Sequence, residues 1–180
     1  MSKEYWGFEK ERGDTAFLAG IVDLSADELN AICDFGYAID ADIFRVEDND
    51  TIPLDESLKK LNVSVKERLH YYTERYGIGA SHEDIDLIDF QLEELRADNV
   101  NDYLCRSVAS CSSSSQVSEV VDYFLDVLKY HMQSPLHIYE PASSDKNREI
   151  IGSNYMAMTW DYFFISYYDY FVLLIFGSQL

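Results

Sequence analysis

The sequence YMAMTWDYFFISYYDYFVLLIFG, residues 155–177, carries the strongest fold signal in this 180-residue chain. It holds ten aromatic residues, and its only charged side chains are Asp161 and Asp169. Aromatic and β-branched residues suit a pleated, buried surface, and a continuous apolar run of this length suits strands that are covered on both faces. We therefore predict two β-strands joined by a tight polar turn at residues 167–169, which together form the core of a small domain.

Upstream of this hairpin, apolar residues recur at helical spacing in four segments. The predicted helices are residues 26–37, 58–76, 81–98 and 117–133. The third helix begins with Ser81 as its cap, since an acidic residue follows three positions later in a capping-box pattern. Gly77 is the expected stop of the second helix. The fourth helix has the widest apolar surface, so we expect it to pack on the sheet.

Several segments have weaker patterns. Residues 15–24 are short and apolar and fit a strand or a first helical turn; we favour the strand, followed by a helix that Ser25 and Glu28 cap. Residues 38–46 alternate in part and fit either a strand or a continuation of the helix before them. A second capping pattern at Ser64 allows the helix of residues 58–76 to restart at Val65. Residues 136–139 form a short predicted strand, and a loop follows it.

The order of these elements predicts the fold class. Helices occupy the first three-quarters of the chain and strands its end, which is the α+β pattern. We expect the helices to pack on a small antiparallel sheet that contains the C-terminal β-hairpin. The chain length suits one core, and no repeat or linker divides it, so residues 1–180 form a single predicted domain.

The charge of the chain is strongly negative. The formal net charge is −19 and the sequence pI is about 4.3. This balance argues against binding to nucleic-acid phosphates and to anionic membrane surfaces. It favours a basic protein partner, or it serves only to keep the protein in solution.

Targeting features point to the cytoplasm. The first residues, MSKEYWGFEKERGD, contain no apolar signal segment. Asp161 and Asp169 interrupt the C-terminal apolar run, which makes it too short to cross a membrane. Cys33, Cys105 and Cys111 form an odd set without a CxxC motif, and we expect reduced thiols.

Catalytic motifs are missing from the sequence. Neither a GxGxxG nor a GxxxxGK[ST] pattern occurs, and no HExxH is found. His82, Glu83, Asp84 and Asp86 are close in sequence, but acids at a helix start are explained by the helix dipole. We therefore predict no metal site, no cofactor and no enzymatic activity. An enzyme site built from scattered His, Cys and carboxylate residues is the alternative that the sequence leaves open.

Acidic residues concentrate in two stretches. Residues 23–56 contain eleven acids against Arg45 alone, and residues 83–102 contain eight acids against Arg96 alone. Between them, residues 59–75 are locally basic. Either the basic helix pairs with its acidic neighbours, or one acidic surface docks a cationic protein, which would raise the association rate and the specificity.

The closing sequence DYFFISYYDYFVLLIFGS, residues 161–178, resembles the final hairpin of immunity proteins from bacterial contact-dependent growth inhibition and related polymorphic toxin systems. The resemblance covers about the last twenty residues, and the size and acidity of the chain agree with it. It implies an antitoxin that binds and neutralises a cognate basic toxin domain, commonly a nuclease, in the cytoplasm. The alternative among binding proteins is a mimic of nucleic-acid charge that inhibits DNA-binding proteins. The predicted partner-binding residues are Asp40, Asp42, Glu47, Asp48, Asp86, Asp89 and Glu93.

Overall fold

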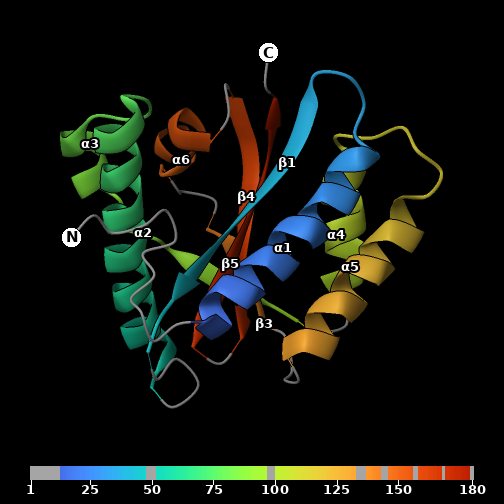
Figure 1. Ribbon diagram of the computed structural model, residues 1–180, viewed down its shortest axis with the longest axis horizontal. Helices are drawn as coiled ribbons and strands as arrows, with labels where there is room; N and C mark the ends of the chain where they lie inside the picture. Colours follow the sequence, from blue (N-terminus) through green and yellow to red (C-terminus); the bar gives the residue numbers. More distant parts are fainter. Residues whose placement is uncertain are drawn as a thin grey trace.

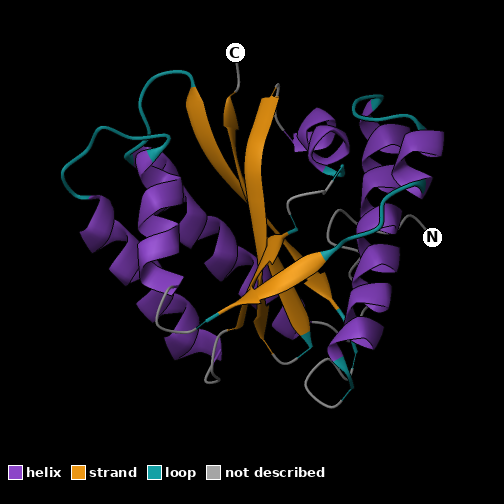
Figure 2. Ribbon diagram, turned by 180° about the vertical axis from the view of Figure 1, so that it is seen from behind, coloured by secondary structure: helices purple, strands orange, loops and turns teal. Residues whose placement is uncertain are grey.

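A five-stranded antiparallel sheet lies between two groups of helices in the computed structural model (Figures 1 and 2). The structure describes residues 13–47, 52–96, 100–132, 137–142, 146–155, 158–167 and 169–178. The elements in chain order are α1 (Gly13–Ala31), β1 (Tyr37–Arg45), α2 (Leu54–Tyr76), α3 (His82–Asp86), β2 (Leu92–Leu95), α4 (Val100–Ala109), α5 (Val117–Met132), β3 (His137–Pro141), α6 (Arg148–Tyr155), β4 (Met158–Tyr167) and β5 (Tyr170–Ser178). The strand order is β1-β5-β4-β3-β2, which confirms the predicted α+β class and the C-terminal hairpin.

The hairpin of β4 and β5 forms the centre of the sheet. The two strands pair from Met158 opposite Ser178 to Tyr167 opposite Tyr170, and β1 pairs along the other side of β5. The first predicted hairpin residue, Tyr155, instead ends α6, a helix that the sequence pattern does not indicate. Of the predicted turn, residue 168 lies outside the described residues.

Alternate side chains of the hairpin supply two separate cores. Phe163, Ile165, Val172, Leu174 and Phe176 face the group of α1, α4 and α5. The intervening side chains, among them Phe164 and Leu173, face α2 and α6. Every second residue of a strand points to the same face, so a strand that is covered on both faces has no polar alternation. This explains the continuous apolar run.

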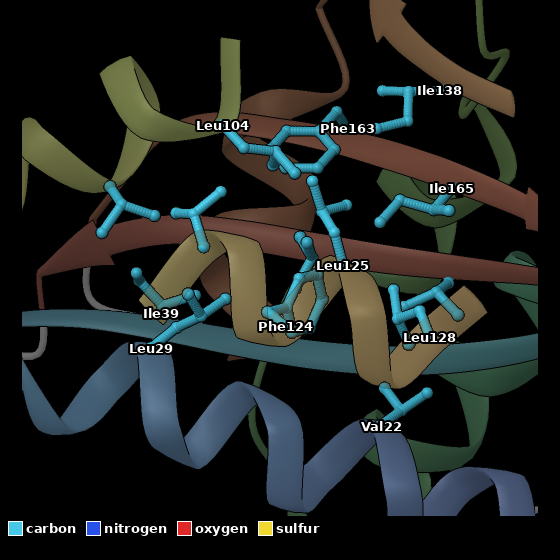
Figure 3. Close-up of a cluster of buried hydrophobic side chains, with 14 of the residues drawn as sticks. Val22, Leu29, Ile39, Leu104, Phe124, Leu125, Leu128, Ile138, Phe163 and Ile165 are labelled. Carbon is cyan, nitrogen blue, oxygen red and sulfur yellow. The ribbon is translucent and has the colours of Figure 1, made fainter. Parts of the chain in front are cut away.

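Helix α5 covers the first of these cores, as predicted. Phe124, Leu125 and Leu128 of α5 lie in one buried cluster with Phe163 and Ile165 of β4, and Leu125 lies beside Phe163 (Figure 3). Leu29 and Val22 of α1 close the same core from below in that view. The bounds of α5 agree closely with the predicted helix, because its apolar residues keep the helical spacing throughout.

The prediction of a strand at residues 15–24 is wrong. These residues lie within α1, where Leu18, Ala19, Val22 and Leu29 are buried at helical spacing. Ser25 is therefore inside the helix and caps nothing: its hydroxyl donates to the carbonyl of Ile21 at 2.7 Å. The helix ends at Ala31, and the turn to β1 uses Gly36 with a φ of 91°. Residues 38–46, left open between helix and strand, contain β1 for most of their length.

The prediction of one helix over residues 81–98 is also wrong. Ser81 does cap α3, since its hydroxyl accepts from the backbone N–H of Asp84 at 3.1 Å. However, α3 ends at Asp86, and β2 follows as an edge strand paired with β3. The helical spacing of the apolar residues is misleading here. Ile85 is buried from the short helix α3, whereas Ile88 and Phe90 are buried from the loop that follows it.

Two further segments differ in detail from their predictions. Helix α2 is continuous from Leu54 to Tyr76, so it does not restart at Val65. Ser64 instead donates its hydroxyl to the carbonyl of Arg45 at 3.3 Å. Gly77 ends α2 in the left-handed conformation, as predicted. The predicted short strand is β3, which extends to Pro141.

Candidate protein-binding site

Asp42 is a buried structural residue, not a surface residue as predicted. Its side chain lies on β1 and is only 1% exposed. Arg68 of α2 donates to its Oδ1 at 2.7 Å, and the hydroxyls of Tyr72 and Tyr155 donate to its Oδ2 at 3.0 and 2.6 Å. Both carboxylate oxygens are therefore occupied inside the protein, and Asp42 connects β1 to α2 and α6.

The electrostatics of this cluster favour a permanent ion pair. Burial is the largest influence and opposes the charge of Arg68, but Asp42, Tyr72 and Tyr155 together outweigh it and raise the pKa of Arg68 above its usual value. Burial and then Asp42 raise the pKa of the Tyr155 phenol well above its usual value, so the phenol stays a donor. Arg68 also lies over the ring of Phe44, with its guanidinium carbon 5.3 Å from the ring centroid.

Helix α2 also covers the outer edge of β1. Lys60, Ser64 and Arg68 donate to the carbonyls of Glu47, Arg45 and Ile43 respectively. The three donors are four residues apart along α2. The three acceptors are two residues apart along β1 and the residues that follow it. Both spacings correspond to about 6–7 Å, so the helix and the strand edge match in length.

The second acidic stretch lies on another side of α2. Lys66 donates to the backbone carbonyl of Asp86 at 2.7 Å, and His70 Nε2 is 3.0 Å from the Asp86 carboxylate. Asn62 donates to the Asp89 carboxylate at 3.4 Å. The side chains of α2 thus bind the neighbouring acidic stretch of the same chain. This agrees with the first of the two interpretations of the charge pattern, in which the basic helix pairs with its acidic neighbours.

The remaining predicted residues do not form one surface. Glu47, Asp86 and Asp89 are exposed around α2, and Asp40 is exposed on β1. Glu93 is exposed on β2, which is the opposite edge of the sheet from β1. Asp48 lies outside the described residues.

A more uniformly acidic surface is formed by α1 and α5, which pack against each other on the other side of the sheet (Figure 1). We call this surface the α1–α5 face. Helix α1 contains no Lys or Arg, and Lys129 is the only such residue of α5. The exposed acids of the two helices are Asp23, Asp27, Glu28, Glu119, Asp122 and Asp126.

Large exposed apolar and aromatic side chains accompany these acids. Leu24 of α1 is 66% exposed, and Tyr123 and Tyr130 of α5 are 56% and 77% exposed. Asp122, Tyr123, Asp126 and Tyr130 recur at helical spacing, so they share the outer side of α5. Asp122 and Asp126 lie off the apolar stripe of the predicted helix, which is a signal present in the sequence. Tyr123 and Tyr130 belong to its predicted apolar surface, and the structure leaves both exposed.

Like charges are crowded where α1 meets β1. Burial, then Asp42 and Asp27, raises the pKa of Asp23 to about 6. Asp40 keeps contact with solvent, but the surrounding protein removes part of its hydration and, with the charges of Asp42, Asp23 and Asp27, raises its pKa to about 6. Asp40 lies on the same side of β1 as Asp42, which faces α2 and α6, so its charge acts on Asp23 and Asp27 but its side chain is not part of the α1–α5 face. A cation bound there would relieve the repulsion.

Comparisons with known proteins identify no family. No family model matches the sequence, and no curated protein matches it. Citrus MAF1, known from a crystal structure, is similar over 88% of this chain and 99% of its own chain, with 15% sequence identity and a TM-score of 0.42. That score is too low to support an inference about fold or function. Within the described residues, no helix is long and apolar enough to cross a membrane.

Proposed function

We propose that this protein is an immunity protein that binds and neutralises a cognate cationic toxin domain through the α1–α5 face. The observation that carries the proposal is the set of exposed acids on α1 and α5, which have a single Lys among them and lie beside exposed Leu24, Tyr123 and Tyr130. The resemblance of residues 161–178 to immunity-protein hairpins supports the class of function. The binding mode is argued from charge and exposure.

The acids around α2 are less suited to this role. The carboxylates of Asp42 and Asp86 already contact Arg68 and His70, so a partner would have to compete with these intramolecular contacts. On α1, by contrast, the whole helix supplies no basic side chain. None of the predicted residues belongs to α1 or α5, so we propose an interface on these two helices instead.

The two kinds of residue on this face have complementary effects on binding. Exposed carboxylates steer a cationic partner and raise the association rate, with a strong dependence on salt. Tyr side chains supply large contact areas at low entropic cost and are frequent binding hot spots. Tyr123 and Tyr130 also suit Lys or Arg side chains of the partner, because aromatic rings attract cations. Neutralisation follows if the bound face covers the toxin's substrate site.

The test uses the toxin domain encoded immediately upstream of this chain's gene. Co-expression of the wild-type protein is expected to protect cells, and the purified proteins are expected to form a complex below micromolar concentration. Asp27→Lys with Asp126→Lys reverses charge on the α1–α5 face and should weaken binding by at least about 100-fold. Tyr123→Ala should weaken it by about tenfold.

A matched control reverses two exposed acids elsewhere. Glu74→Lys with Glu93→Lys changes the net charge equally, on α2 and β2, and should alter affinity by no more than a few-fold. An equal loss in both double variants would show that net charge, not this face, mediates binding. Absence of protection and of a complex for the wild type would overturn the immunity function. Salt-sensitive inhibition of several unrelated DNA-binding proteins would instead identify a nucleic-acid mimic.

A further inference from the structure

Two histidines from different helices point their Nδ1 atoms at each other. His70 lies on α2 and His82 is the first residue of α3. Their Nδ1 atoms are 2.6 Å apart, the ring planes differ by 12°, and the ring centroids are 4.7 Å apart. The short N–N distance with nearly parallel planes places one proton between the two nitrogens in a hydrogen bond.

A carboxylate fixes the orientation of His70. Its Nε2 is 3.0 Å from Oδ1 of Asp86, so the Nε2–H donates to the carboxylate. The Nδ1 of His70 then carries a lone pair directed at His82. An imidazole backed by a carboxylate in this way is the usual arrangement of metal-binding histidines, because the carboxylate sets the tautomer and increases ligand basicity.

Both rings are accessible, and their supports are fixed. The side chain of His70 is 25% exposed, and His82 is exposed. Ser81 caps α3 and its hydroxyl donates to the Asp84 carboxylate at 2.6 Å, which orders the residue next to His82. Lys66 holds the other end of α3 through the carbonyl of Asp86. An ion from solvent can therefore reach the pair without opening the protein.

We propose that His70 Nδ1 and His82 Nδ1 form a two-histidine site for a late first-row divalent ion of the Zn²⁺, Cu²⁺ or Ni²⁺ type. Imidazole nitrogen is a preferred ligand of these ions, at about 2.0–2.1 Å. In the hydrogen-bonded pair the two Nδ1 atoms face each other at 2.6 Å, so the rings must turn and separate before both lone pairs can converge on one ion. His82 is exposed at the start of a five-residue helix, which leaves its side chain room to turn.

The proton balance of binding is simple. In the neutral pair, His82 Nδ1–H donates to His70 Nδ1. The ion replaces this proton, which moves through solvent to Nε2 of His82, so both Nδ1 lone pairs become ligands. Among the described side chains, no three His, Cys, Asp or Glu residues are grouped to hold an ion, so water completes the coordination. The bound ion would link α3 to α2.

Titration of the tag-free protein with Zn²⁺, followed by calorimetry, tests the site. The chain has four histidines, and His131→Ala with His137→Ala leaves only the proposed pair. We expect one Zn²⁺ per chain, with unchanged affinity in that control. His82→Ala should abolish binding, and Asp86→Asn should weaken it by about 10–100-fold. His82 is exposed, so its replacement leaves the core intact, which circular dichroism would check.

The ligands are identified by Cu²⁺ electron paramagnetic resonance. Two equatorial nitrogens are expected in the wild type and in the His131→Ala/His137→Ala control, and one nitrogen in His70→Gln. Zn²⁺ affinity that persists in His82→Ala, or a nitrogen pattern that His70→Gln and His82→Ala leave unchanged, would overturn the proposal. No detectable binding at millimolar Zn²⁺ in the wild type would overturn it as well.

Discussion

Both faces of the sheet bury an apolar cluster, but they differ in how their helices carry charge. On one face, α2 holds five basic residues, and several of them bind the carbonyls or carboxylates of β1 and α3. On the other face, α1 has no basic residue and α5 has Lys129 as its single Lys or Arg. Figure 1 shows these helix groups on opposite sides of the central strands.

This difference shows that the local density of acids is a poor guide to a binding surface. The stretch with eleven acids includes Asp42, which is buried and ion-paired, and the stretch with eight acids supplies partners for α2. What matters is whether basic side chains of the same chain reach the acids first. The α1–α5 face is distinguished by the scarcity of such side chains, not by a larger number of acids.

The largest expected effect tests whether the two cores contribute equally to stability. Phe163 and Phe164 are adjacent on β4 and fully buried on opposite faces. Phe163→Ala and Phe164→Ala should each lower the free energy of unfolding by about 4 kcal/mol, because each leaves a cavity in a packed core. Urea unfolding measures both. A cost below about 1 kcal/mol for either variant would mean that its face is loosely packed.

A smaller effect distinguishes paired from crowded acids within one strand. Asp42→Ala should cost about 3 kcal/mol, because it leaves Arg68 without its carboxylate and two tyrosine hydroxyls without their acceptor. Asp40→Ala, two residues away on the same side of β1, removes an exposed acid and should not destabilise the protein by more than about 0.5 kcal/mol. Equal costs in urea unfolding would contradict the division into paired and crowded acids.

The same strand shows what the sequence could and could not predict. The hairpin, α2 and α5 could be predicted, because the residues that they bury form regular apolar patterns within each segment. Asp40 and Asp42 have the same residue type and the same side of the strand, yet only Asp42 is covered. Its coverage depends on Arg68 and Tyr155, which are 26 and 113 positions away, and local patterns carry no such information.

Local patterns also gave wrong predictions where one spacing of residues fits two different backbone structures. The stripe of residues 81–98 fitted a helix, but the chain leaves α3 after Asp86, where Asn62 accepts from the backbone N–H of Phe90 at 2.9 Å. Similarly, Ser25 and Glu28 had the spacing of a capping box inside a longer helix. A capping pattern marks a helix start only if the residues before it are not helical, and that depends on the packing of α1.

The two serines provide the next prediction. Ser81→Ala should lower stability by about 1 kcal/mol, because the hydroxyl satisfies a free N–H at the start of α3. Ser25→Ala should change it by less than about 0.5 kcal/mol, because a hydroxyl bonded to the carbonyl four residues earlier adds little to a helix. Thermal unfolding of both variants measures the difference. A larger loss for Ser25→Ala would indicate that Ser25 does begin a helix.

The smallest effect concerns the crowded acids themselves. Asp23 and Asp40 have pKa values raised to about 6 in the folded protein, so they bind more protons folded than unfolded between about pH 4 and pH 6. Stability is therefore lost as pH rises through this window, and the loss is complete above about pH 7. Asp23→Asn with Asp40→Asn should recover it, by less than about 1 kcal/mol, because both side chains are exposed and solvent screens them.

The measurement is the difference in unfolding free energy between this double variant and the wild type as a function of pH. It should be near zero at pH 4 and reach a plateau above pH 7. About 1 M salt should lower this plateau in the stability difference only in part. Salt screens the repulsion among Asp23, Asp27 and Asp40, but it does not change their loss of hydration.

A cationic partner on the α1–α5 face would remove the same repulsion, and binding near pH 6 should then release protons. Binding without proton release would place the partner away from Asp23 and Asp40, even if the α1–α5 face were otherwise correct.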